Sequence, residues 1–74
     1  MPKLPIVMPS RVVKALKRAG FVKARQTGSP LVLWQPQTKR IVSIPIHPRT
    51  LKRGLLSGII KEANLTLEDF LKLL

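Results

Sequence analysis

The amino-acid sequence predicts an α+β fold in which helices cover one face of a three-stranded antiparallel sheet, in the order α-β-β-β-α-α. Three observations predict it. Apolar residues keep helical spacing near both ends of the chain, whereas residues 21–46 are rich in β-branched side chains. The connections between the expected strands are short, which favours antiparallel neighbours. A chain of 74 residues also has the size of one domain.

The chain begins with an extended arm, residues 1–9, because three prolines in this stretch prevent a helix. A single domain is expected over residues 10–74. Its first helix is predicted to begin at Ser10, whose hydroxyl can accept a hydrogen bond from a free amide of the first turn. The helix runs through Ala19, and Gly20 supplies the left-handed residue that ends it.

Three strands are expected in the middle of the chain, at residues 21–26, 31–35 and 40–46. Residues 27–30 have the chemistry of a turn between the first two strands. Pro45 has no backbone N–H to donate, so we expect the third strand to lie at an edge of the sheet or to end there.

Two helices are expected after the strands. The longer one lies within residues 51–64, is entered at Gly54 and ends at Asn64, because the apolar residues between them keep helical spacing. Gly58, in its interior, either weakens the helix or permits close packing on a neighbour. The last helix is predicted to begin after Thr66, whose hydroxyl can cap it.

The charge balance is strongly basic, with fourteen Lys and Arg against three Asp and Glu and a net charge of +11. A field of this sign attracts polyanions, and nucleic acid is the leading expected partner. The sequence has no Cys and one His, which excludes disulfides, thiolate ligands and a histidine metal cluster. We therefore expect no metal and no cofactor. No apolar run approaches the roughly 20 residues that span a bilayer, so we expect a cytoplasmic protein without a membrane partner.

Basic side chains form several clusters along the chain, and no acidic residue lies among them before Glu62. On the first helix they lie opposite Val12, Val13 and Leu16, so one face packs and the other is cationic. The cations expected to bind RNA are Arg11, Lys14, Arg18, Lys23, Arg25, Lys39, Arg40, Arg49, Lys52 and Arg53.

Four further residues have both a functional and a structural interpretation. Gly28 and Ser29 could offer amides and a hydroxyl to an RNA phosphate, although Gly-Ser turns are common. Trp34 is the stacking candidate for an unpaired base, or equally an aromatic of the core or of a partner interface. His47 is the one side chain suited to proton transfer near neutral pH, or it hydrogen-bonds the turn beside Pro48.

Four stretches in this order and at this spacing form a recognisable pattern: residues 16–21, 25–29, 40–47 and 51–65. They resemble the HicA toxins of bacterial and archaeal toxin-antitoxin systems, and the resemblance covers residues 10–74. It implies a fold like the double-stranded-RNA-binding domain. It also implies a metal-independent endoribonuclease that cleaves mRNA and a HicB antitoxin that covers the active surface.

The chain departs from the family pattern at Pro30. The family reads Gly-Ser-His after the first strand, and that His is regarded as catalytic, whereas this chain reads Gly28-Ser29-Pro30. Proline has no titratable group and cannot transfer a proton. His47 matches another His common in the family and is only a weak substitute candidate. We therefore expect an RNA-binding toxin domain with impaired or absent cleavage and a HicB-like antitoxin. The alternative is a non-catalytic, small basic nucleic-acid-binding module.

Overall fold

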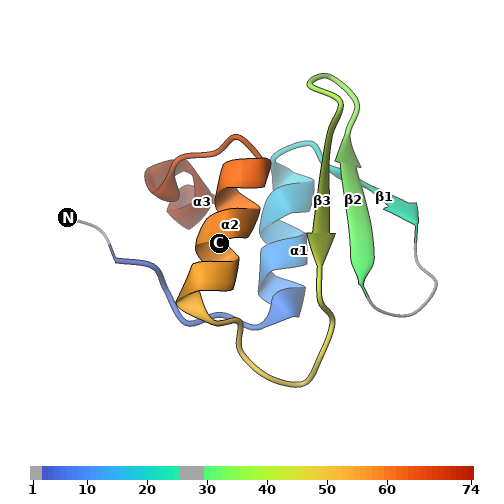
Figure 1. Ribbon diagram of the computed structural model, residues 1–74. Helices are drawn as coiled ribbons and strands as arrows, with labels where there is room; N and C mark the ends of the chain where they lie inside the picture. Colours follow the sequence, from blue (N-terminus) through green and yellow to red (C-terminus); the bar gives the residue numbers. More distant parts are fainter. Residues whose placement is uncertain (1–2, 26–29) are drawn as a thin grey trace.

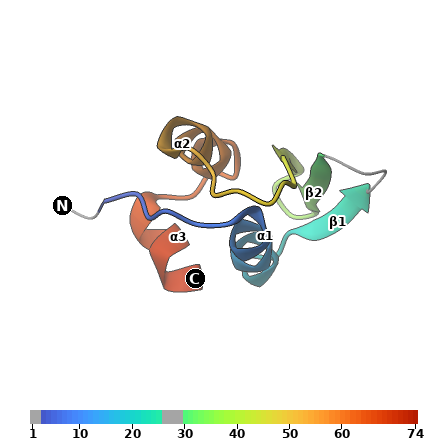
Figure 2. The same cartoon turned by 90° about the horizontal axis from the view of Figure 1, so that it is seen from below.

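The structure, a computed structural model, describes residues 3–25 and 30–74, and its elements follow the predicted order (Figure 1). The helices are α1 (Pro9–Arg18), α2 (Arg53–Glu62) and α3 (Leu67–Leu73), and the strands are β1 (Val22–Arg25), β2 (Leu31–Gln35) and β3 (Arg40–Ile44). Figure 2 shows α1 and α2 on the same side of the sheet, with α3 beside α1 on the side away from the strands. The predicted α+β fold, with its helices on one face of the sheet, is confirmed.

The sheet is an antiparallel meander in the order β1-β2-β3. In β2, Leu31, Leu33 and Gln35 are buried, whereas Trp34 is exposed, because alternate residues of a strand point to opposite faces. The sheet therefore has an inner face against the helices and an open face.

Two strands are shorter than predicted. β3 ends at Ile44 rather than residue 46, because Pro45 follows and cannot donate to the ladder. β1 begins at Val22 rather than residue 21 and has a bulge between Lys23 and Arg25. The predicted strand end at residue 26 and the turn residues 27–29 lie outside the described residues.

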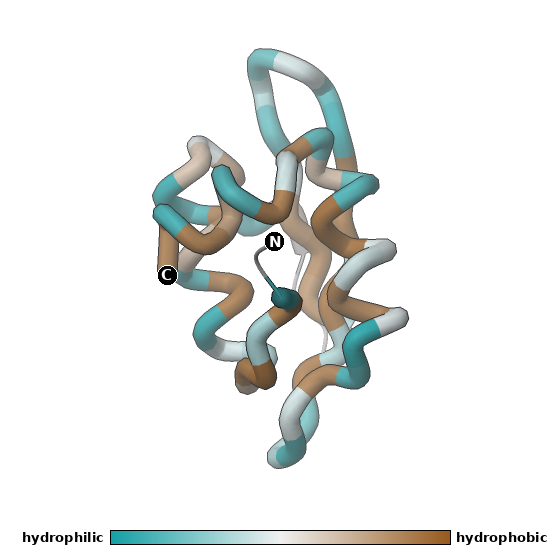
Figure 3. The backbone as a smooth tube through the Cα atoms, turned by 90° about the vertical axis from the view of Figure 1, so that its left-hand side faces the viewer, coloured by the Kyte–Doolittle hydropathy of each residue, from teal (hydrophilic) through white to brown (hydrophobic). Residues whose placement is uncertain are grey.

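The hydrophobic core lies between the helices and the inner face of the sheet. Burial of one large apolar side chain contributes about 1.5–3 kcal/mol to stability. Seen from the helical side, hydrophilic and hydrophobic segments alternate along the helices, as expected for amphipathic helices (Figure 3). The largest fully buried side chains are Pro9, Val12, Leu16, Leu33, Val42, Ile44, Leu56 and Phe70.

The predicted cap of α1 at Ser10 is wrong. The helix begins one residue earlier, at Pro9, with Met8 in the cap position and no side-chain cap. Proline fits the first helical position because its fixed φ is helical and its missing N–H would have no partner there. The helix ends at Arg18, one residue before the predicted Ala19, which is its C-cap. Gly20 has φ of 98° and is the predicted left-handed residue that follows.

The segment before α1 is tied to the chain that leads into α2. The backbone amide of Leu51 donates to the carbonyl oxygen of Val7 at 2.9 Å. Both side chains are buried. This contact holds the connection between β3 and α2 against the N-terminal segment, and α2 begins at Arg53, one residue before the predicted entry at Gly54.

Candidate nucleic-acid interface

The outer face of α1 carries a row of cations. Arg11, Lys14 and Arg18 are exposed and line a hollow of about 350 Å³ together with Leu74. Their spacing of three and four residues places them on one face, opposite the buried Val12 and Leu16 of the same helix. The hollow therefore presents positive charge from three side chains, which suits the phosphates of a nucleic-acid backbone.

One member of this row also has a structural contact. Arg18 donates from Nη1 to the backbone carbonyl oxygen of Leu73 at 2.6 Å. This bond satisfies a carbonyl in the last turn of α3 and fixes one edge of the α1 hollow. The position of the guanidinium is thus set by a residue 55 positions away in the chain.

A second cationic hollow lies in the connection between β3 and α2. Its volume is about 330 Å³, and it is lined by His47, Arg49, Thr50, Lys52 and Leu55. All five residues except the apolar Leu55 can donate a hydrogen bond to an anion. These side chains are exposed.

His47 hydrogen-bonds the turn beside Pro48, which is the structural one of the two interpretations that the sequence allowed. Its Nδ1 accepts a hydrogen bond from the backbone amide of Arg49 at 3.3 Å. Because Nδ1 is the acceptor, the neutral ring carries its proton on Nε2. The ring can therefore donate a hydrogen bond outward from Nε2 while its other nitrogen shapes the turn.

Pro30, the position expected from the resemblance to correspond to a catalytic His, lies at the same end of the sheet as His47. Leu31 pairs with Ile44, so Pro30 and the residues after β3 meet where β2 begins and β3 ends. Figure 1 shows the start of β2 and the connection from β3 to α2 at this common end. Pro30 is exposed there.

The other residues predicted to bind RNA do not line either of the two cationic hollows. Lys39 lies in the turn between β2 and β3, at the other end of the sheet, and Arg40 follows it. Arg40 donates from Nη1 to the carbonyl oxygen of Glu62 at 3.3 Å, so it ties β3 to the end of α2. Trp34 lies on the open face.

Three other cations and two turn residues were also predicted to bind RNA. Lys23 lies on β1 and is exposed, and Arg53 is the first residue of α2. Arg25 ends β1. Gly28 and Ser29 lie outside the described residues, so their predicted phosphate contacts remain predictions.

Sequence reasoning missed two contributors to the hollows. Thr50 lines the hollow beside His47, and its place between Arg49 and Lys52 was the available signal. The end of α3 contributes Leu74 and the carbonyl of Leu73 to the α1 hollow. No sequence pattern links those residues to Arg18.

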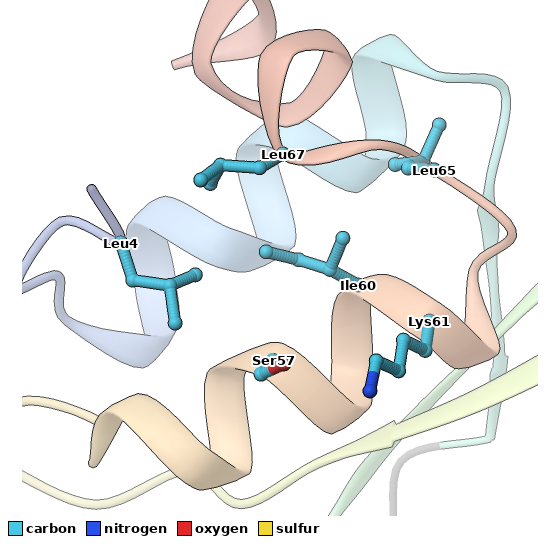
Figure 4. A pocket seen from close by; sticks show the side chains of 6 residues that line it. All are labelled: Leu4, Ser57, Ile60, Lys61, Leu65 and Leu67. Carbon is cyan, nitrogen blue, oxygen red and sulfur yellow. The ribbon is translucent and has the colours of Figure 1, made fainter. Parts of the chain in front are cut away.

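A third hollow, of about 300 Å³, is different in character (Figure 4). It lies between the N-terminal segment, α2 and the start of α3, and four of its six lining side chains are apolar. The lining residues are Leu4, Ser57, Ile60, Lys61, Leu65 and Leu67. One cation in an apolar hollow does not resemble the two cationic hollows, so we do not count it as part of the interface.

Within the described residues no cluster of three His, Asp or Glu side chains could hold a metal ion. Over the same ranges, every helix is too short or too polar to cross a bilayer.

A comparison with protein families agrees with the sequence pattern. The family model described as HicA toxin of bacterial toxin-antitoxin matches residues 9–65, more than half of the chain, from the start of α1 to just before α3. No curated protein matches the chain. Membership of this family implies an antitoxin partner and confirms the predicted resemblance. With its fold, its cationic surface and this match, the chain belongs to the HicA toxin family.

Proposed function

We propose that this protein is a cytoplasmic toxin that binds mRNA, pairs with a HicB-like antitoxin, and has impaired or absent RNA cleavage. The observation that carries the RNA-binding part is the row of Arg11, Lys14 and Arg18 around one hollow on α1. The net charge of +11 supports it, because a field of that sign raises the local concentration of a polyanion.

The hollow at the β3–α2 connection extends the proposed RNA surface. Arg49 and Lys52 supply charge, and Thr50 and the Nε2 proton of His47 supply hydrogen-bond donors to phosphate oxygens. The proposed RNA path therefore uses two separate groups of donors, which position a backbone without reading its bases.

The impaired cleavage is proposed from Pro30. Attack of a ribose 2′-OH on the adjacent phosphate needs a base to take the hydroxyl proton, and proline has no group that can do so. His47 is poorly arranged to replace it. Its Nδ1 already accepts from Arg49, and its Nε2 carries the proton in the neutral ring, so neither nitrogen is a ready base.

The binding part is tested by titrating a labelled single-stranded RNA against the protein and against single variants of α1. Arg11→Ala and Lys14→Ala should each weaken binding. Each lost phosphate contact should also lower the slope of log affinity against log salt by about 0.7. Arg18 is left unchanged because it also holds α3.

The matched control is Lys72→Ala, which removes an exposed cation of α3 that lines neither cationic hollow. It should change the affinity and the slope much less than the α1 variants. If Lys72→Ala weakens RNA binding as much as Arg11→Ala does, the α1 hollow is not the binding site, and the proposed RNA surface is wrong.

A further inference from the structure

The last turn of α3 borders the proposed RNA surface of α1. The Nη1 of Arg18 donates to the carbonyl oxygen of Leu73 at 2.6 Å, and the next residue, Leu74, lines the α1 hollow together with Arg11, Lys14 and Arg18. Figure 2 shows α3 beside α1, on the side away from the strands. The α1 hollow is therefore built from two helices, and α3 contributes one wall of it.

The position of the Leu73 carbonyl is set by packing that does not involve Arg18. Phe70, one turn earlier, is fully buried in the core, and Leu67 and Leu73 are partly buried against it. The last four carbonyls of a helix have no partner within the helix, and this end carries a partial negative charge. The last turn of α3 thus offers a fixed acceptor to a cation beside it.

The bond to Leu73 holds Arg18 in place before RNA arrives. A long cationic side chain has many rotamers, and fixing one of them in a complex costs conformational entropy and therefore affinity. In this protein the rotamer of Arg18 is already restricted by α3. The bond uses one of the five N–H donors of the guanidinium and a neutral acceptor, so the positive charge is kept for a phosphate.

The opposite effect, in which the Leu73 carbonyl competes with RNA for Arg18, fits the structure less well. A phosphate oxygen is charged and is a stronger acceptor than a carbonyl oxygen. The bond also draws the guanidinium toward the hollow, because Leu74 lines that same hollow. Arg18 is thus held on the side of α1 where Arg11 and Lys14 lie.

We infer that α3 is a positioning element of the RNA surface. By holding Arg18 at the edge of the α1 hollow, its last turn raises the affinity for RNA, and bound RNA in turn stabilises α3, because coupling between two sites is reciprocal. This inference rests on the proposed binding of RNA at α1. It adds to the site a helix that lies outside residues 9–65, the range of the family match.

Lys72 offers a matched pair of variants for the test. It is exposed in the last turn of α3 and lines neither cationic hollow. Lys72→Ala and Lys72→Gly remove the same charge, but glycine is the weaker helix former, so Lys72→Gly alone loosens the last turn. A labelled single-stranded RNA should bind Lys72→Gly about two- to fivefold more weakly than Lys72→Ala. The slope of log affinity against log salt should be equal in both, because the same phosphate contacts form in the complex.

Arg18→Ala separates positioning from a general loss of stability. In the Arg18→Ala background, Lys72→Gly and Lys72→Ala should bind RNA equally, because α3 then has no guanidinium to hold. Arg18→Ala itself should lower the salt slope by about 0.7, since it removes a phosphate contact. Unfolding midpoints well above the assay temperature would verify that all variants are folded.

Hydrogen exchange of the α3 amides tests the reciprocal effect. Saturating RNA should slow their exchange in the wild-type protein more than in Arg18→Ala, because RNA stabilises α3 through Arg18. Faster exchange of these amides with RNA would show that RNA pulls Arg18 away from Leu73, and it would overturn the inference.

Three results of the binding experiment would also overturn it. Equal RNA affinities of Lys72→Gly and Lys72→Ala would show that α3 does not position Arg18. Tighter binding by Lys72→Gly would show that the Leu73 carbonyl competes with RNA. An equal loss with and without Arg18 would mean that α3 acts by another route. In each case the proposed function stands if Arg11→Ala and Lys14→Ala weaken binding, and if they do not, the proposed RNA surface fails together with the inference.

Discussion

Gln35 is a buried polar side chain that joins three parts of the fold. Its Nε2 donates to the carbonyl oxygen of Ala19 at 2.9 Å, and its Oε1 accepts from the amide of Gln37 at 3.0 Å. One end of the amide therefore holds the end of α1, and the other shapes the turn after β2. Gly20 lies against it, and a Cβ at Gly20 would be 2.6 Å from Nε2.

Gly20→Ala should destabilise the protein by about 1–3 kcal/mol, because alanine is strained in the left-handed backbone conformation at this position and its methyl group would displace the Gln35 amide. Urea unfolding at 25 °C measures the change. Gly58→Ala is the matched control, since nothing lies within 4 Å of its Cβ position, and it should stabilise α2 by about 0.5–1 kcal/mol. A loss of stability with Gly58→Ala would mean that this glycine is needed for packing.

Of the two interpretations of Gly58 offered by the sequence, the structure favours the one without close packing. Sequence could identify Gly20 as the end of α1, because the end of an amphipathic pattern before a glycine is a local signal. It could not identify Gln35 as the partner of that end, because the contact spans 16 positions and depends on the face to which β2 turns the side chain.

α3 shows how a short helix is retained at the end of the chain. It is seven residues long, too short to be stable alone, and lies outside the range matched by the family model. Two features hold it: the side chain of Phe70 is fully buried, and the Oγ1 of Thr66 accepts a hydrogen bond from the amide of Asp69 at 3.0 Å. The predicted cap at Thr66 is confirmed.

Thr66→Ala should lower the free energy of unfolding by about 1 kcal/mol, because the amide of Asp69 loses its acceptor. Thr66→Ser keeps the hydroxyl and should retain most of that stability. The two variants are compared by urea unfolding. Equal losses in both would show that the methyl group of Thr66, rather than its hydroxyl, matters at this position.

Element types were predictable throughout, but several element boundaries were not. Ser10 has the side chain of a cap, yet Pro9 suits the first helical position and is fully buried, so packing decides where α1 begins. β3 ends at Ile44 because Pro45 follows. The sequence left open whether Pro45 ends the strand or places it at an edge of the sheet. The register of the three strands was not predictable either, since the bulge between Lys23 and Arg25 in β1 has no clear sequence signal.

At the scale of the whole molecule, charge is distributed unevenly. The described carboxylates are at the end of α2 and the first turn of α3, whereas cations occupy α1, the β2–β3 turn and the β3–α2 connection. A net charge of +11 on a small domain costs stability through self-repulsion. The cations that we propose bind RNA therefore also lower the stability of the fold through their mutual repulsion.

The melting temperature should therefore rise with salt, since the Debye length falls from about 30 Å at 0.01 M to about 8 Å at 0.15 M ionic strength. Thermal unfolding followed by circular dichroism measures it. A double variant, Lys3→Glu and Lys72→Glu, lowers the net charge from +11 by two units per substitution, to +7, and should show a smaller rise. An equal rise in both proteins would mean that salt acts through something other than net charge.

We propose that this toxin binds RNA but lacks a group that can take the proton at the position of Pro30. The most direct measurement compares cleavage of a single-stranded RNA, without added metal, by the wild-type protein and by Pro30→His. We expect the wild-type protein to bind the RNA with little or no cleavage, and Pro30→His to cleave it. Efficient turnover by the wild-type protein that His47→Ala abolishes would show that cleavage is not impaired, because His47 would then supply the chemistry that Pro30 cannot.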